Sequence, residues 1–94
     1  MRPEKLTEPE IASRLNDVPF WHQESAVITR SFELPTFSAA IAFVVRVGFL
    51  AEQVDHHPDI DIRYRHVTIA LTTHDAGGLT TLDFTLASQI DAIA

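Results

Sequence analysis

Three of the five histidines in this 94-residue chain stand where the sequence predicts helices and strands to end. His56 and His57 come directly before Pro58, and His74 follows a stretch of alternating apolar residues. Because the ends of neighbouring elements can converge on one pocket, we expect these imidazoles to share a site. An imidazole gains or loses its proton near neutral pH, so a set of them can supply both an acid and a base. The pattern therefore indicates general acid–base chemistry.

Each histidine taken singly also has a simpler interpretation. A cationic His56 would stabilise the carboxyl end of a helix, where the macrodipole is negative, and His74 would merely end a strand. His22 and His66 lie within strand patterns, where a solvated or core-edge position is the commoner outcome. The joint placement of the three histidines at positions 56, 57 and 74 is what favours a site.

A metal centre is the alternative to acid–base chemistry, because Asp55 and Asp59 flank the histidine pair and could join it as ligands. Neighbouring side chains at positions 56 and 57 point in different directions, however. The chain also contains neither a His-Glu-x-x-His motif nor any cysteine. We therefore expect no metal site.

The elements that must position these residues follow from hydrophobic periodicity and from helix and turn signals. They are, in order, a helix over about residues 7–17, strands over 20–22 and 26–34, a long helix to about residue 54, strands over 59–64 and 66–72, and a last helix. Thr7 with Glu10 and Thr80 with Asp83 form capping boxes for the first and last helices, and Thr36 caps the long one. A polar turn near residues 23–25 joins the first two strands.

This order, α-β-β-α-β-β-α, predicts the fold class. Two hairpins separated by a long helix are best satisfied by an antiparallel sheet with helices on one face. Ile60, Ile62 and Tyr64 should lie on the dry face of their strand, since they alternate with charged residues. We expect a single α+β domain over residues 1–94, with two layers and a four-stranded antiparallel sheet.

The long helix carries two apolar stripes, which are Phe37, Ile41, Val44, Gly48 and Ala51, and beside them Phe43, Val47, Leu50 and Val54. One stripe suffices to cover a sheet, so the second should meet another helix or a second copy of the chain. Without a partner we expect Phe43, Val47 and Leu50 to be exposed. The strand over residues 26–33 would also present an edge that no lysine or proline run protects. The chain is therefore expected to be a homodimer or homotetramer.

Composition excludes several classes of protein. The formal charge is −6, which argues against binding to nucleic-acid phosphates, and the lack of cysteine excludes disulfides. The apolar run over residues 39–45 is shorter than the roughly 20 residues of a membrane-spanning helix. No apolar signal segment follows Met1. We expect a soluble, cytoplasmic protein with no membrane partner.

The motif around the histidines resembles that of the pterin-4a-carbinolamine dehydratases, also called 4a-hydroxytetrahydrobiopterin dehydratases. Its members, with their spacing, are Glu52, three residues, His56-His57-Pro58, five residues, Tyr64, nine residues, His74, eight residues, and Asp83. The similarity continues upstream through Trp21 and the Arg30-Ser31-Phe32-Glu33 segment, and downstream through residues 73–80, so it covers nearly the whole chain. Phe20 stands where the family commonly has glycine.

This resemblance implies the removal of water from a 4a-hydroxytetrahydropterin to give the quinonoid dihydropterin, in support of tetrahydrobiopterin recycling. No metal or organic cofactor is implied. His56 and His74 resemble the acids that protonate the leaving hydroxyl, and His57 resembles a substrate-holding group or the base at N5. By the same resemblance, Asp55, Thr72, Thr73 and Asp75 are pterin-binding residues, and Glu52, Pro58 and Asp83 support the site. Trp21 could stack on a flat heterocycle at the rim of a pocket, although a core position is commoner for tryptophan.

Two other functions remain open from the sequence. Animal relatives also act as dimerisation cofactors of a homeodomain transcription factor, a role that would use the apolar helix surface instead of the histidines. The fold could also serve another pterin, such as that of molybdenum-cofactor metabolism. The resemblance further implies a functional link to an aromatic amino-acid hydroxylase, whose product would be the substrate.

Overall fold

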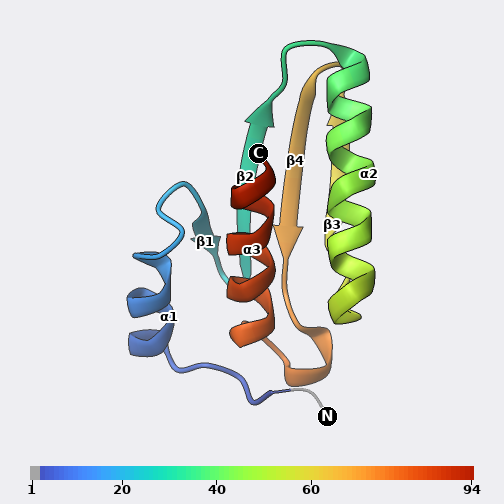
Figure 1. Ribbon diagram of the computed structural model, residues 1–94. Coiled ribbons are helices and arrows are strands. Elements are labelled where there is room, and N and C mark those ends of the chain that lie inside the picture. The colour runs from blue at the N-terminus through green and yellow to red at the C-terminus, as the bar shows by residue number, and fades with distance from the viewer. Residues whose placement is uncertain (1–2) are drawn as a thin grey trace.

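The computed structural model describes residues 3–94, so residues 1 and 2 of the expected domain lie outside the described part of the chain. Its elements are α1 (Glu8–Leu15), β1 (His22–Glu24), β2 (Val27–Glu33), α2 (Phe37–Val54), β3 (Asp59–Arg63), β4 (His66–Leu71), a 3₁₀ turn η1 (His74–Ala76) and α3 (Thr81–Ile93). Three helices and a four-stranded antiparallel sheet form a single α+β domain in the expected order (Figure 1).

The sheet has the strand order β1-β2-β4-β3 and is antiparallel throughout. Alternate side chains of the two central strands point to one face, because strand side chains have a period of two. On β2 these are Ile28 and Phe32, and on β4 they are Val67, Ile69 and Leu71, all of them buried. Figure 1 shows α2 and α3 lying together over the sheet, so this face carries the core.

The capping boxes predicted for the first and last helices are both present. Thr7 and Glu10 exchange hydrogen bonds at the start of α1, and Thr80 and Asp83 do so at the start of α3. The side chain of Thr36 accepts a hydrogen bond from the Ala39 amide and caps α2. Local sequence signals therefore set where all three helices begin.

The hairpin boundaries differ from the predicted ones. β1 begins at His22, two residues later than the strand expected over residues 20–22. Gln23, which we expected in a turn, lies in β1, and the turn is formed around Ser25, whose φ is 57°. Tyr64, which we expected on the dry face of its strand, lies instead in the two-residue connection between β3 and β4. Its φ is 54° and it is 68% exposed. The reason is that Arg63 pairs directly with His66, which leaves only Tyr64 and Arg65 to reverse the chain.

The prediction of which α2 stripe faces outward was wrong. Phe43 and Val47 are buried, Leu50 is half-buried, and the Phe43 ring lies 4.9 Å from that of Phe32 on β2. The outward stripe, which we call the α2 stripe, consists of Phe37, Ile41, Val45 and Phe49, which are between 40% and 69% exposed. The helix is rotated so that its bulky Phe43 fills the space over the sheet.

The sheet edges also differ from the expectation. β2 pairs with β4 on one side from Ile28 to Glu33, and β1 pairs with its other side at Val27, Ile28 and Thr29. Within residues 3–94, only the segment over residues 30–33 of β2 lacks a strand on that second side. β3 forms the opposite edge of the sheet and pairs only with β4 in the described chain.

By length and composition alone, α2 could cross a membrane, since its 18 residues have a mean hydropathy of 1.6. That is weak evidence, because core helices meet the same condition. Here Ala40, Phe43, Val47 and Ala51 are buried, and α2 packs against α3 and β4. Only 22% of the helix is buried in the single chain, so one face of α2 belongs to the core and the rest is open.

Candidate active site

The end of α2 directs the histidine pair. Asp55 adopts the left-handed conformation, with φ 49° and ψ 47°, and so ends the helix; the His56 amide then donates to the Ala51 carbonyl at 3.1 Å. The next side chains diverge as expected: His56 is only 5% exposed, whereas His57 lies on the surface. One turn at a helix end therefore supplies one buried and one solvated imidazole.

The segment after β4 directs the third histidine. Thr73 and Gly78 form an isolated antiparallel bridge that closes a small loop. Within it, η1 carries His74 and ends at Gly77, whose φ of 77° is readily adopted only by glycine. His74 thus lies in a short 3₁₀ turn beyond the strand, held by the loop that Thr73 and Gly78 close.

These two segments meet at one cavity of about 170 Å³. Its lining comprises His56, His57, Thr72, Thr73, His74 and Asp75. The structure therefore brings together the three histidines and three of the residues that the sequence singled out as pterin-binding. Asp55 is their chain neighbour at the end of α2.

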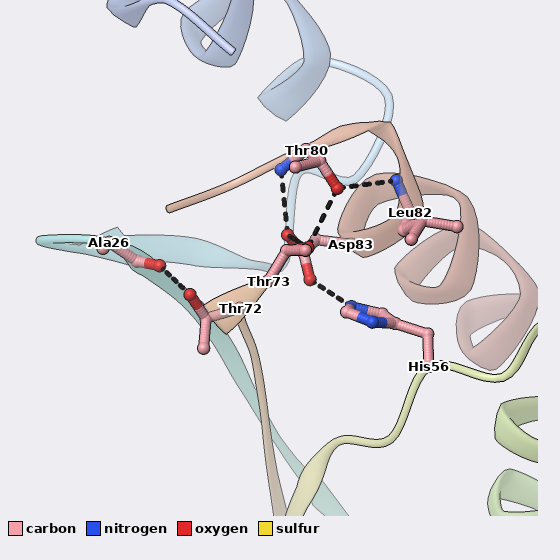
Figure 2. Close-up of polar contacts among 7 residues, drawn as sticks. All are labelled: Ala26, His56, Thr72, Thr73, Thr80, Leu82 and Asp83. Atoms are coloured by element: carbon pink, nitrogen blue, oxygen red, sulfur yellow. Dashed lines mark hydrogen bonds and ion pairs between the residues drawn. The ribbon is translucent and has the colours of Figure 1, made fainter. Parts of the chain in front are cut away.

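A buried carboxylate holds His56. Its Nε2 lies 2.6 Å from Oδ1 of Asp83, a fully buried residue 27 positions further along the chain (Figure 2). The other oxygen, Oδ2, accepts hydrogen bonds from the Thr73 hydroxyl at 2.8 Å and from the Thr80 amide at 3.0 Å. One carboxylate thus serves both as the capping residue of α3 and as the partner of His56.

The other predicted site residues have separate contacts. Nε2 of His57 pairs with Oε2 of Glu52 on the surface of the molecule. The Thr72 hydroxyl donates to the Ala26 carbonyl at 2.6 Å, which ties the end of β4 to the β1–β2 hairpin. Pro58 is half-buried and follows the histidine pair at the start of β3.

Trp21 lies apart from this cavity. It is buried against Phe32, and its indole N–H donates to Oδ1 of Asp91 at 2.8 Å. The same oxygen lies 2.6 Å from the guanidinium of Arg30, which also stacks over the ring of Phe20. Sequence reasoning did not single out Arg30 or Asp91 as a pair, and no local spacing could have done so, because 61 residues separate them.

Sequence reasoning also assigned Thr80 only as a helix cap. Its hydroxyl lies 2.9 Å from that of Thr73, so it belongs to the same buried cluster as Asp83 and His56. The capping box itself was the available signal, since the carboxylate that caps α3 is the one that binds His56. Among residues 3–94, no group of three or more His, Cys, Asp or Glu side chains is arranged to hold a metal ion.

Comparison with known proteins identifies the family. Residues 4–93 match the family model described as pterin 4 alpha carbinolamine dehydratase. A Roseiflexus sp. (strain RS-1) protein is 58% identical over 89 residues, which cover 95% of this chain and 96% of that protein. A Chloroflexus aurantiacus protein is 60% identical over 89 residues, with the same coverage of both chains. Each is named "Putative pterin-4-alpha-carbinolamine dehydratase".

Solved structures agree on the fold. The crystal structure of a transcriptional coactivator/pterin dehydratase from Brucella melitensis superposes with a TM-score of 0.93 at 36% identity, covering 97% of this chain and 99% of that one. A pterin dehydratase-like protein, described as a RuBisCO assembly factor in the alpha-carboxysome, has a TM-score of 0.65 at 21% identity, covering 79% of this chain and 86% of that one, and so shares the fold alone. With the full-length family match and relatives at 58–60% identity, this chain belongs to the pterin-4-alpha-carbinolamine dehydratase family.

Proposed function

We propose that this protein removes water from a 4a-hydroxytetrahydropterin and releases the quinonoid dihydropterin. The observation that carries the proposal is the convergence of three imidazoles on one cavity in a chain of the pterin-4-alpha-carbinolamine dehydratase family. The cavity opens to solvent on a side where His57, His74 and Asp75 are exposed. A small flat substrate could therefore reach all three imidazoles.

The reaction needs two proton transfers. The C4a–O bond breaks as the leaving hydroxyl takes a proton and departs as water. N5 loses its proton to a base, and the electron pair of that N–H bond forms the C4a=N5 double bond. A positioned acid and a positioned base each contribute about 10²–10⁴-fold in such reactions. Imidazoles fit both tasks because they exchange protons near neutral pH.

The surroundings of the histidines suggest how these tasks are divided. His56 and His74 are the proton donors to the hydroxyl in this proposal. His57 accepts the N5 proton, and its Glu52 partner stabilises the imidazolium that forms. Asp83 stabilises the His56 imidazolium in the same way until that ring gives up its proton. In this proposal, Asp55, Thr72 and Asp75 bind the pterin. Trp21 is left out, since its indole N–H is already bound to Asp91 outside the cavity.

The test is a dehydratase assay with the full chain after treatment with a chelator. Synthetic 4a-hydroxytetrahydropterin should lose its hydroxyl faster with the protein than in buffer at the same pH, because the acid and base are side chains. A rate equal to that of buffer contradicts the proposal. Activity that disappears on chelation and returns with added metal contradicts the acid–base mechanism while leaving the dehydratase activity intact.

The same assay separates the other candidate functions. A dehydratase of tetrahydrobiopterin recycling would be coupled to an aromatic amino-acid hydroxylase in the cytoplasm, and adding the protein to such a hydroxylase should shorten the lifetime of its carbinolamine product. Turnover of a different pterin only, such as one from molybdenum-cofactor metabolism, would identify that substrate instead. The absence of turnover with every pterin would favour a role in protein dimerisation, as the coactivator name of the Brucella melitensis relative suggests.

We also propose that the protein acts as a homodimer or homotetramer. Support comes from two exposed surfaces of the single chain. The α2 stripe presents four large apolar side chains to solvent, and β2 has an unpaired outer side over residues 30–33 in the described chain. Surfaces of both kinds are normally covered in stable proteins.

A further inference from the structure

Thr73 has no hydrogen-bonding group left for a substrate, although it lies at the cavity. Its side chain bonds to Asp83 and to Thr80, and the residue is only 2% exposed. Its amide donates to the Gly78 carbonyl at 3.2 Å, and its own carbonyl accepts from the amides of Ala76 and Gly78. All its polar groups are thus engaged within the protein.

The directions of the side-chain bonds follow from counting hydrogens. A hydroxyl donates once, and the single hydrogen of Thr73 goes to Oδ2 of Asp83. The Thr80 hydroxyl must then donate to Thr73, and it accepts in turn from the Leu82 amide at 3.2 Å. The bonds therefore run in one direction, from the α3 backbone through two hydroxyls to the carboxylate. Figure 2 draws these contacts.

These hydrogen bonds end at the imidazole of His56. Because Oδ2 of Asp83 is held by Thr73 and by the Thr80 amide, Oδ1 is fixed where it meets Nε2 of the imidazole at 2.6 Å. A carboxylate accepts, so Nε2 carries a proton. Any proton that His56 exchanges with a ligand must then pass through Nδ1.

We propose that Thr73 is a positioning residue, whose hydroxyl fixes the Asp83 carboxylate and thereby keeps the proton of neutral His56 on Nε2. This assignment replaces the pterin contact that the sequence suggested for Thr73. It rests on the proposed function only in its kinetic consequence: the His56 imidazolium gives its Nδ1 proton to the leaving hydroxyl and returns to the neutral form with its proton on Nε2. The positioning itself is a property of the free protein.

The experiment uses the full chain labelled with ¹⁵N-histidine, without substrate, as wild type and as Thr73→Val. Valine keeps the shape of threonine but removes the hydroxyl, so Oδ2 loses one of its two donors. At a pH where His56 is neutral, NMR of the wild type should show the Nε2–H tautomer, and Thr73→Val should show a mixture of both tautomers. In the dehydratase assay, kcat of this variant should fall about 10- to 100-fold with KM little changed.

Two further variants serve as controls. Thr73→Ser keeps the hydroxyl and should restore both the tautomer and kcat. Thr68→Val makes the same substitution on β4, five residues before Thr73. Within the described residues the Thr68 hydroxyl bonds only to that of Ser31, so this variant should leave both properties as in the wild type. A loss of activity of the same size in Thr68→Val would show a general effect of valine and would overturn the positioning role.

The outcomes separate this proposal from the function it builds on. A folded Thr73→Val protein with unchanged tautomer, or a variant that raises KM and leaves kcat intact, overturns the positioning role. If Thr73→Val does not fold, the wild-type spectrum still decides, because an Nδ1–H tautomer of His56 contradicts the proposal. A tautomer change in a protein without dehydratase activity would support the positioning role and refute the proposed function.

Discussion

The two adjacent histidines divide the site into a fixed part and an adaptable part. His56 is buried and bound to a fully buried carboxylate, whereas His57 is exposed and bound to Glu52, which is itself exposed. A buried hydrogen-bonded group loses little further freedom when substrate binds, so its geometry is set in advance. A surface pair can adjust to the ligand. The first suits a proton donor, and the second suits a group that closes on its substrate.

His74 offers the cleaner mutational test of the acid role, because it is exposed and stands at the start of the 3₁₀ turn η1. We expect His74→Ala to lower kcat by about 10²–10⁴-fold, as the loss of one positioned proton transfer would. The melting temperature should stay close to that of the wild type, since few buried contacts are lost. Steady-state kinetics and thermal unfolding of the same preparation measure the two effects.

The matched control is His66→Ala. His66 is exposed at the start of β4, outside the cavity, so its removal should change kcat by less than a few-fold. His56→Ala, in contrast, should lower both kcat and stability, because it leaves the Asp83 carboxylate buried without its imidazole. An equal loss of activity in His66→Ala and His74→Ala would show that the site is elsewhere.

At this scale, the sequence predicted which histidines converge, and the family resemblance named Glu52 and Asp83 as supporting residues, but neither gave the hydrogen bonds that hold the site. Spacing and element ends were enough to group residues 56, 57 and 74, because backbone geometry decides where elements end. The Thr73–Thr80 hydroxyl pair and the Trp21–Asp91 bond depend on how α3 lies over the sheet. Such contacts join distant parts of the chain, and a local pattern contains no information about their geometry.

At the scale of the elements, the residues at which helices begin are the feature that the local sequence determines most strongly. At the start of α1, the Thr7 amide donates to the Glu10 carboxylate at 2.9 Å. This backbone bond above all, with the Thr7 side chain next, holds the pKa of the Glu10 carboxyl below its ordinary value. A folded-state pKa below the unfolded one stabilises the fold at neutral pH. That stabilisation is lost as the pH falls below the unfolded pKa and through the folded one.

Glu10→Gln should therefore lower the melting temperature at pH 7 and have a smaller effect in acid. Glutamine can still complete a capping box, so the variant removes only the contribution of charge. Thermal unfolding of both proteins from pH 7 down to below the ordinary pKa of glutamate measures the difference. The exposed Glu4→Gln serves as control, and a difference between Glu10→Gln and wild type that does not shrink with acid would contradict the expectation.

The rotation of α2 shows where element-level prediction stops. Its sequence is apolar on most sides, so periodicity gave its limits and its excess of apolar surface but could not decide which stripe meets the sheet. That choice depends on tertiary packing, in which the Phe43 ring fits beside Phe32 and the small Ala40 and Ala51 allow close approach. The Tyr64 turn has the same origin, because the pairing of Arg63 with His66 fixes it.

At the scale of the whole molecule, the single chain leaves the α2 stripe and the edges of the sheet uncovered. The α2 stripe lies on the outer side of the helix layer, away from the histidine cavity, whose lining includes none of its four residues. The unpaired outer side of β2 lies on the sheet layer instead. Assembly through either surface leaves the cavity residues unused, so oligomer formation and catalysis can be tested separately.

The chain should accordingly have a mass of at least two copies in solution, and Ile41→Glu should reduce it. A buried carboxylate without a partner is costly, so the charge should destabilise any assembly that covers the α2 stripe. Light scattering coupled to size exclusion at micromolar concentration gives the mass, with the exposed Ser38→Glu on the same helix as the matched control. A wild-type mass near the 10.5 kDa of one chain refutes the oligomer. An oligomer that Ile41→Glu leaves intact, with Ile41→Glu still folded, would place the interface on the sheet edge, because the helix surface would then be free.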